Sequence, residues 1–216
     1  MPSIPFSELA GRFIATLERF SAGVIVESEN LRAKPARVRV NVGGLSTNCL
    51  VFLWTITPGG GPPGTRPKDE RRIQITAAKQ FPLRPGCRTL IGGWSPEHEV
   101  YAFWDVKRHS RYSEHSPSFQ VNARTLETAG AVGLATQFRP TRQGREVIVA
   151  VAPDSLLWYV QHGESLHDAE EDAPHIGELL ESTPEEQNEF VESSVSEVEA
   201  NRRIQKIGRA SCRERV

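Results

Sequence analysis

Between residues 37 and 151 the chain consists largely of short apolar segments of strand length, separated by glycine, proline and other turn residues. Arg37–Val42 alternates strictly between valines and polar residues, which is typical of a half-buried strand. Cys49–Ile56 is almost continuously apolar, which indicates a central strand buried on both faces. Further strands are predicted at 71–76, 88–94, 99–106, 118–121 and 146–151. Helices between these segments are few, which argues against a doubly wound α/β fold.

Three helices are expected around these strands. Ser7–Phe20 has apolar residues at helical spacing, with Ser7 as its cap. A short helix is expected from Asn122 to about Leu134, and another begins at Pro153. We therefore predict an α+β fold with a mixed or antiparallel, partly closed β-sheet of about seven strands and N-terminal, inserted and C-terminal helices.

Two local details of the sheet are also predicted. Gly92 and Gly93 lie inside the strand at 88–94, and glycine inside a strand often marks a bulge. Residues 95–98, Ser-Pro-Glu-His, form a turn sequence, so the strands at 88–94 and 99–106 should pair as a hairpin.

The charge of the chain is distributed unevenly along its length. Residues 1–164 contain 20 Lys and Arg against 14 Asp and Glu, a net charge of +6, whereas residues 165–200 contain 12 Asp and Glu and no Lys or Arg. We expect a globular domain at 1–165, an acidic linker at 166–184 and a helix at 185–206. Residues 207–216 read as one frame of a translated sequencing adapter and are excluded from the fold argument.

Composition excludes several classes of protein. No apolar run approaches 18 residues, and the N-terminus lacks the basic and apolar regions of a signal peptide, so neither a membrane partner nor secretion is expected. Cys49 and Cys87 are isolated, which argues against a zinc site or a disulfide framework and fits a cytoplasmic protein. The glycine-rich stretch at 58–67 lacks the Gly-Lys-Ser/Thr of a phosphate-binding loop.

Two groups of basic residues are candidates for contact with DNA. Lysine and arginine neutralise phosphates, arginine and glutamine can bind base edges, and aromatic rings stack on bases. The first group surrounds the glycine-rich loop, and the second follows the strand at 99–106. The expected DNA-binding residues are Arg66, Lys68, Arg71, Arg72 and Gln74 in the first group, and Lys107, Arg108, His109, Arg111, Tyr112 and Ser116 in the second.

A metal-dependent nuclease site is an alternative use of the second group. Asp105 and Lys107 match the acid-x-Lys part of such a site, with Glu97 or Glu99 as a further acidic ligand. On an extended strand Glu99 and Asp105 would lie about 20 Å apart, too far to share one ion. We therefore expect Asp105 to pair with basic side chains, and we expect no catalytic residue or metal site in this chain.

Seven segments, in order over roughly residues 45–165, resemble the N-terminal methylase-associated X domain of bacterial HNH-type restriction endonucleases. They are Leu53–Thr57, Arg72–Thr76, Thr89–Pro96, Val100–Asp105, Lys107–His109, Ser116–Gln120 and Ala152–Val160. Glu199–Lys206 resembles the helix that precedes the HNH domain in such proteins. The stretch Gly59–Gly64 is longer than the loop expected at that position.

The resemblance implies a DNA-recognition part of a restriction endonuclease, with duplex DNA as its partner and a DNA methylase as a second partner. The HNH domain would follow Lys206 and would use a divalent metal, while the present chain would need no cofactor. A module that contacts only another defence protein is the third interpretation. Neither the DNA feature recognised nor the oligomeric state follows from the sequence.

Overall fold

The computed structural model describes residues 3–58, 67–110, 117–141 and 144–168. Within these ranges the helices are α1 (Phe6–Phe20), α2 (Val106–His109), α3 (Ala123–Val132) and α4 (Leu156–His167), with a 3₁₀ turn at Pro153–Ser155. The strands are β1 (Ile25–Glu29), β2 (Ala36–Val42), β3 (Leu45–Thr55), β4 (Thr57–Pro58), β5 (Glu70–Gln74), β6 (Cys87–Ser95), β7 (Val100–Trp104), β8 (Ser118–Asn122), β9 (Leu134–Thr141) and β10 (Gly144–Val151).

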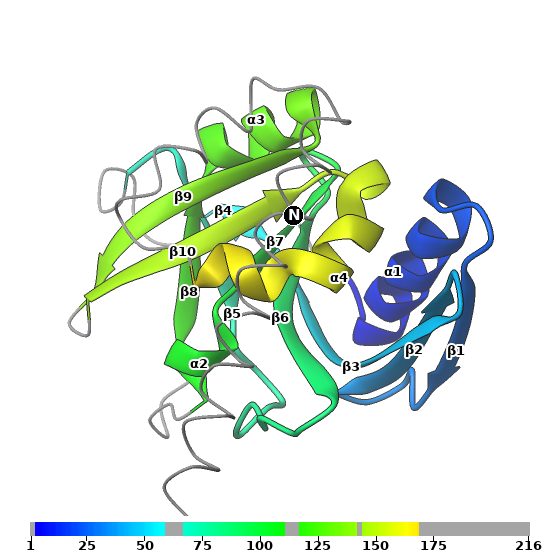
Figure 1. Ribbon diagram of the computed structural model, residues 1–216. Coiled ribbons are helices and arrows are strands. Elements are labelled where there is room, and N and C mark those ends of the chain that lie inside the picture. Colours follow the sequence, from blue (N-terminus) through cyan, green and yellow to red (C-terminus); the bar gives the residue numbers. More distant parts are fainter. Residues whose placement is uncertain (1–2, 59–66, 111–116, 142–143, 169–216) are drawn as a thin grey trace, which may run out of the picture. The chain divides into compact units, whose positions relative to one another are not determined.

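Seven strands form one large mixed sheet in the order β1-β2-β3-β6-β7-β10-β9 (Figure 1). Strands β3 and β6 are parallel, and every other neighbouring pair is antiparallel. The sheet is open, with β1 and β9 as its edges, so the predicted partial closure is wrong. The predicted α+β class, the mixed sheet of seven strands and the three groups of helices are thus confirmed.

A separate small sheet has the order β4-β5-β8. Parallel neighbours such as β3 and β6 need a crossover connection, and here that connection contains β4 and β5 of the small sheet. The segments at 71–76 and 118–121, predicted as members of the main sheet, therefore belong to this second sheet. The alternation of apolar and polar residues predicts a strand with one buried and one exposed face. It does not predict which sheet the strand joins.

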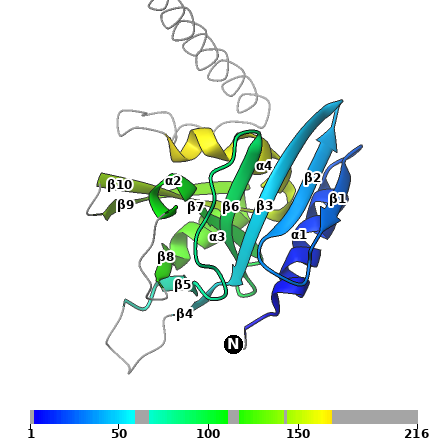
Figure 2. The same cartoon turned by 90° about the horizontal axis from the view of Figure 1, so that it is seen from below.

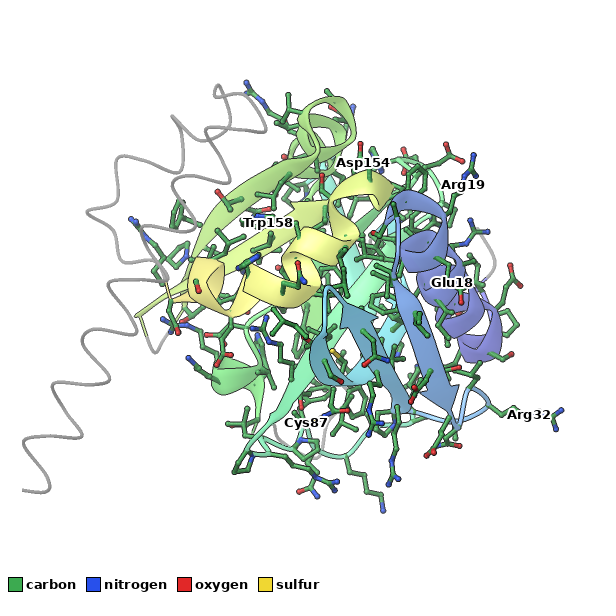
Figure 3. The ribbon with its side chains drawn as sticks, turned by 45° about the vertical axis from the view of Figure 1, so that its right-hand side comes forward. Glu18, Arg19, Arg32, Cys87, Asp154 and Trp158 are labelled. Carbon is green, nitrogen blue, oxygen red and sulfur yellow. The ribbon has the colours of Figure 1, made fainter. Side chains whose placement is uncertain are left out.

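Both faces of the large sheet are covered, and two hydrophobic cores result. Helices α1 and α4 lie side by side on one face, where they cover Val51, Leu53 and Tyr101 (Figures 1 and 3). Helix α3 and the small sheet lie on the other face, where their apolar residues join Phe52 and Trp54 in a second core (Figure 2). Cys49–Thr55 is buried throughout, as predicted for a central strand.

The glycines of β6 are not at a bulge, so that prediction is wrong. Gly92 pairs in regular register with Leu53 on one side and Phe103 on the other, and Gly93 continues the ladder. A Cβ atom on Gly92 would lie 2.6 Å from the ring of Phe103, and one on Gly93 would lie 2.6 Å from Ile56 and Ile73. The glycines are needed because side chains of neighbouring elements pack directly against the strand.

Other boundaries also differ from prediction. Pro5, not Ser7, occupies the N-cap of α1, because the helix begins one residue earlier at Phe6. The strand predicted at 99–106 ends at Trp104, since Asp105 caps α2. Helix α4 runs on to His167, whose ring lies against Tyr159 and the carbonyl of Val147.

Strands β1 and β9 were not predicted. Most residues of these edge strands are exposed or half-buried, so their sequences lack the apolar alternation of an inner strand. Their main-chain pairing with β2 and β10 defines them instead. The predicted hairpin of β6 and β7 is confirmed, with Ser95 opposite Val100.

Several predicted segments lie outside the described residues. They are the linker at 166–184 apart from its first three residues, the helix at 185–206, the segment 207–216 and the Gly59–Gly64 stretch. Among the described residues, no helix is long and apolar enough to cross a membrane.

Candidate nucleic-acid interface

The small sheet has one apolar and one polar face. Ile73, Phe119 and Val121 point inward and are buried among the residues of the second core. Arg72 and Gln74 alternate with them on β5, as the sequence predicted, and Ser118 and Gln120 do so on β8. Arg72 lies opposite Gln120, and Gln74 lies opposite Ser118. At these four positions the outward face presents one guanidinium, two amides and one hydroxyl, and Glu70 and Asn122 form the next row of the same face.

The small sheet is held in place by contacts with the large sheet and α3. The missing side chain of Gly93 leaves room for Ile56 and Ile73. The indole Nε1 of Trp104 donates to the carbonyl of Gln120 at 3.2 Å, and the amide of Ala123 donates to the carbonyl of Asp69 at 2.7 Å. The polar face is thus supported by a packed core.

The first basic group lies where β5 begins. Arg71 forms a fork on the carboxylate of Glu97, with Nε and Nη2 at 2.9 and 3.0 Å from its oxygens. The hydrogen bond from Arg71 lowers the pKa of Glu97. The Arg71 side chain is only 12 % exposed, and through Glu97 it stabilises the β6–β7 turn. Lys68 is exposed and Arg72 is half-buried, while Arg66 lies outside the described residues.

The second basic group is on α2, a helix of one turn. Oδ1 of Asp105 accepts the backbone N–H of Lys107 at 2.8 Å and so caps the helix. Oδ2 of Asp105 lies 3.5 Å from Nε of Arg108. Asp105 therefore pairs with basic groups as expected. Arg111, Tyr112 and Ser116 lie outside the described residues.

Lys107 is paired with the end of α4. Its Nζ lies 2.6 Å from Oδ2 of Asp168 and 3.6 Å from Oε1 of Glu164. Burial opposes the charged form of Lys107, but the hydrogen bond and charge of Asp168, with Glu164 and Asp105 adding to them, raise its pKa overall. A phosphate group that approached Lys107 would have to compete with these two carboxylates.

His109 is enclosed on the other side of α2. Its Nε2 is hydrogen-bonded to Oε1 of Glu146, whose residue is 1 % exposed, and its ring stacks on Phe119 at 3.9 Å between centroids. A buried carboxyl group without a partner is costly, so this contact stabilises the fold. His109 was predicted to contact DNA, and Glu146 was not predicted as its partner, although a lone acid at the start of the apolar run 147–151 is a usable signal.

The two basic groups approach opposite ends of the small sheet. Lys68 precedes Glu70 at the start of β5, whereas His109 of α2 stacks on Phe119, next to Ser118, which lies opposite Gln74 at the other end. From Glu70 to Gln74 the strand rises roughly 14 Å. The polar face thus connects two regions that the sequence analysis treated separately, and it adds Ser118 and Gln120 to the candidate residues.

In the described part of the chain, the two glutamates considered as further ligands lie away from Asp105. Glu97 and Glu99 lie before β7, at the end of that strand away from Asp105, and Glu97 is engaged by Arg71. No group of three or more His, Cys, Asp or Glu residues in the described part of the chain could hold a metal ion.

A serine, a histidine and a glutamate also adjoin at the β6–β7 turn. The hydroxyl of Ser95 lies 2.9 Å from Nδ1 of His98, and Nε2 of His98 lies 3.9 Å from Glu127. Ser95 is only 1 % exposed, and its hydroxyl also accepts the backbone N–H of His98 at 3.4 Å. This hydroxyl closes the turn and is not accessible to a substrate.

Comparison with known proteins identifies a family for this chain. The family model described as Methylase-associated X1 matches residues 48–160, a little over half of the chain. The matched range begins within β3 and ends within α4, so it includes the small sheet and α2. An association with methylases suggests a role related to restriction-modification. No curated protein and no solved structure matches the chain. Because the family model covers more than half of it, the chain belongs to the Methylase-associated X1 family.

Proposed function

We propose that this protein recognises duplex DNA as part of a restriction-modification system. The observation that carries the proposal is the polar outer face of the small sheet, where Arg72 lies opposite Gln120 and Gln74 lies opposite Ser118. Residues 1–164 have a net charge of +6, which favours an anionic partner. Family membership supports the link to restriction-modification.

The proposed DNA surface contains Lys68, Arg72 and Gln74 at the small sheet, with Arg66 in the adjoining loop. At the other end it contains Lys107 and Arg108, with Arg111, Tyr112 and Ser116 in the segment after α2. Arg71 and His109 are already engaged by carboxylates, Arg71 by the exposed Glu97 and His109 by the buried Glu146, so both support this surface. In this proposal a separate HNH domain with a divalent metal cuts the DNA, and a DNA methylase is the second partner.

Binding of the full chain to a 30-bp duplex, measured by fluorescence anisotropy at several salt concentrations, tests the proposal. Each phosphate contact contributes about one unit to the slope of log K against log salt. Replacement of Lys107, Arg108 and Arg111 by alanine should weaken binding at least about tenfold and reduce that slope. A matched control replaces Arg19, Arg32 and Arg37, which are exposed on α1, after β1 and on β2.

Equal losses in the two triple variants would show that net charge alone matters, and an absence of salt-dependent binding would refute DNA recognition. Nicking of a plasmid with Mg²⁺ or Mn²⁺ that is lost in Asp105→Ala would replace the proposal by a nuclease site in this domain. Circular dichroism should be used to verify that each variant is folded.

A further inference from the structure

We infer that the outer face of the small sheet enters the major groove of DNA, where Arg72, Gln74 and Gln120 bind base edges directly. This inference rests on the proposed function and extends it from DNA binding to sequence reading. Two of the four polar positions, Ser118 and Gln120, become candidates only through the strand pairing, which brings β8 beside β5.

The side chains on this face have the chemistry of base recognition. An arginine can donate two hydrogen bonds to O6 and N7 of guanine, and a glutamine can bind N6 and N7 of adenine in the same bidentate way. Serine contacts either base pair. Arg72 and Gln120 form one cross-strand row, and Gln74 and Ser118 form the next.

The dimensions of the sheet match the groove. B-DNA has a major groove about 12 Å wide, which admits a two-stranded β-ribbon. Strand β4 has only two residues, so most of the small sheet is the ribbon of β5 and β8, each of five residues. From Glu70 to Gln74 the strand spans roughly 14 Å. A ribbon of two strands of this length fits within the groove.

The acidic residue Glu70 favours contact of this face with DNA bases over contact with the phosphate backbone. Glu70 lies in the same alternating set as Arg72 and Gln74, opposite Asn122. A carboxylate beside a phosphate is repelled, whereas a carboxylate facing a base edge can accept a hydrogen bond from N4 of cytosine. The face carries one acidic and one basic side chain together with several amides. This mixture suits the edges of nucleobases better than a uniformly anionic phosphate backbone.

The side chains proposed to contact bases lie on strands that pack against a buried core. Gln120 precedes Val121 and follows Phe119, both buried, and its carbonyl accepts the indole N–H of Trp104 at 3.2 Å. Nε2 of Gln74 donates to the carbonyl of Pro117 at 3.4 Å, which orients that amide. A site on strands that are packed from behind positions its donors better than a site on a loop.

Selection of binding sites tests the inference. The full chain is incubated with a library of duplexes that contain 20 random base pairs, and the bound fraction is sequenced after several rounds. The wild type should enrich a short motif. Gln120→Ala and Gln74→Ala should each lose preference by about tenfold or more at one A·T position, and Arg72→Ala at one G·C position. Gln80→Ala, an exposed glutamine outside the sheet, should enrich the wild-type motif.

The outcomes separate this inference from the proposed function. Salt-dependent binding with no enriched motif, or with a motif unchanged in all three sheet variants, overturns base reading and leaves DNA binding intact. A wild-type chain that captures no duplex at all overturns both. In the glutamine variants the salt slope should stay at the wild-type value, because amides displace no counterions. An altered slope with an unchanged motif would assign these residues to the phosphate backbone.

Discussion

Nζ of Lys107 on α2 lies 2.6 Å from Oδ2 of Asp168, a residue 61 positions later at the end of α4. Glu164, one turn earlier on α4, adds a second carboxylate at 3.6 Å. These contacts place Asp168, the first acidic residue of the segment 165–200, beside a lysine of the proposed DNA surface. In the proposed function, the carboxylates of Asp168 and Glu164 would therefore compete with DNA phosphate for this cation.

The first prediction follows from this competition. Asp168→Asn combined with Glu164→Gln should raise the affinity of the full chain for duplex DNA several-fold, because Lys107 is then released to bind phosphate. Dissociation constants at low and moderate salt would measure the effect. Lys107→Ala in the same background should remove the gain.

Two exposed acidic residues away from Lys107, Glu18 and Asp154, provide a control for this experiment. Glu18 and Asp154 are exposed on α1 and at the 3₁₀ turn before α4, and Figure 3 labels both. The double variant Glu18→Gln and Asp154→Asn changes the net charge by the same amount. A gain of equal size in this control would contradict a specific role for Asp168 and Glu164.

The second prediction concerns the contact between the two sheets. Gly93→Ala should destabilise the protein by about 1–3 kcal/mol, because the added Cβ would lie 2.6 Å from buried atoms of Ile56 and Ile73. Urea unfolding would measure the loss. Gly11→Ala is the control, since no heavy atom lies within 4 Å of its added Cβ in α1, and it should stabilise by about 0.5–1 kcal/mol. Similar changes in both variants would argue against close packing at Gly93.

The third prediction concerns the buried carboxyl group of Glu146. His109→Ala removes its hydrogen-bond partner and should destabilise the fold by about 1–3 kcal/mol. The double variant His109→Ala and Glu146→Leu should recover part of this loss, because no buried polar group is then left unpaired. A double-mutant cycle by urea unfolding gives the coupling, and additive losses would show that the two side chains act independently.

The fourth prediction is a loss of stability in mild acid. Burial lowers the pKa of His167 below its ordinary 6.5, an effect that the carbonyl of Val147 and the charges of Asp105, Glu146 and Asp168 only partly offset. Burial also lowers the pKa of His162, with Arg88 adding to it. The folded pKa values lie below the unfolded ones, so the unfolded chain binds protons first as pH falls. The contribution is complete above about pH 6.5 and is lost as pH falls through the folded values.

Urea midpoints between about pH 7.5 and pH 5 would measure this loss. The variant His167→Gln should lose less stability over the same interval, since glutamine does not titrate and can still donate to the carbonyl of Val147. His162→Gln should show a separate, additive reduction. An unchanged pH dependence in the double variant would assign the acid sensitivity to other groups.

Much of the fold follows from the sequence because apolar period and segment length are local properties. The alternation of Arg37–Val42 and the apolar run of Cys49–Ile56 correspond to β2 and β3, and the helix at 7–20 corresponds to α1. The turn at 95–98 determined the β6–β7 hairpin in the same way. Each of these signals lies within a few residues, so no knowledge of distant contacts was needed.

The tertiary structure decided which segments meet. Ile73 and Phe119 show the alternation of any half-buried strand, and only the pairing of β5 with β8 and the packing of Ile73 near Gly93 place their strands in a second sheet. The same holds for the charges. Lys107, Arg71 and His109 read alike as basic surface residues, yet their partners Asp168, Glu97 and Glu146 lie 61, 26 and 37 positions away. Pairing across such separations depends on the chain path through three dimensions, which local sequence pattern does not encode.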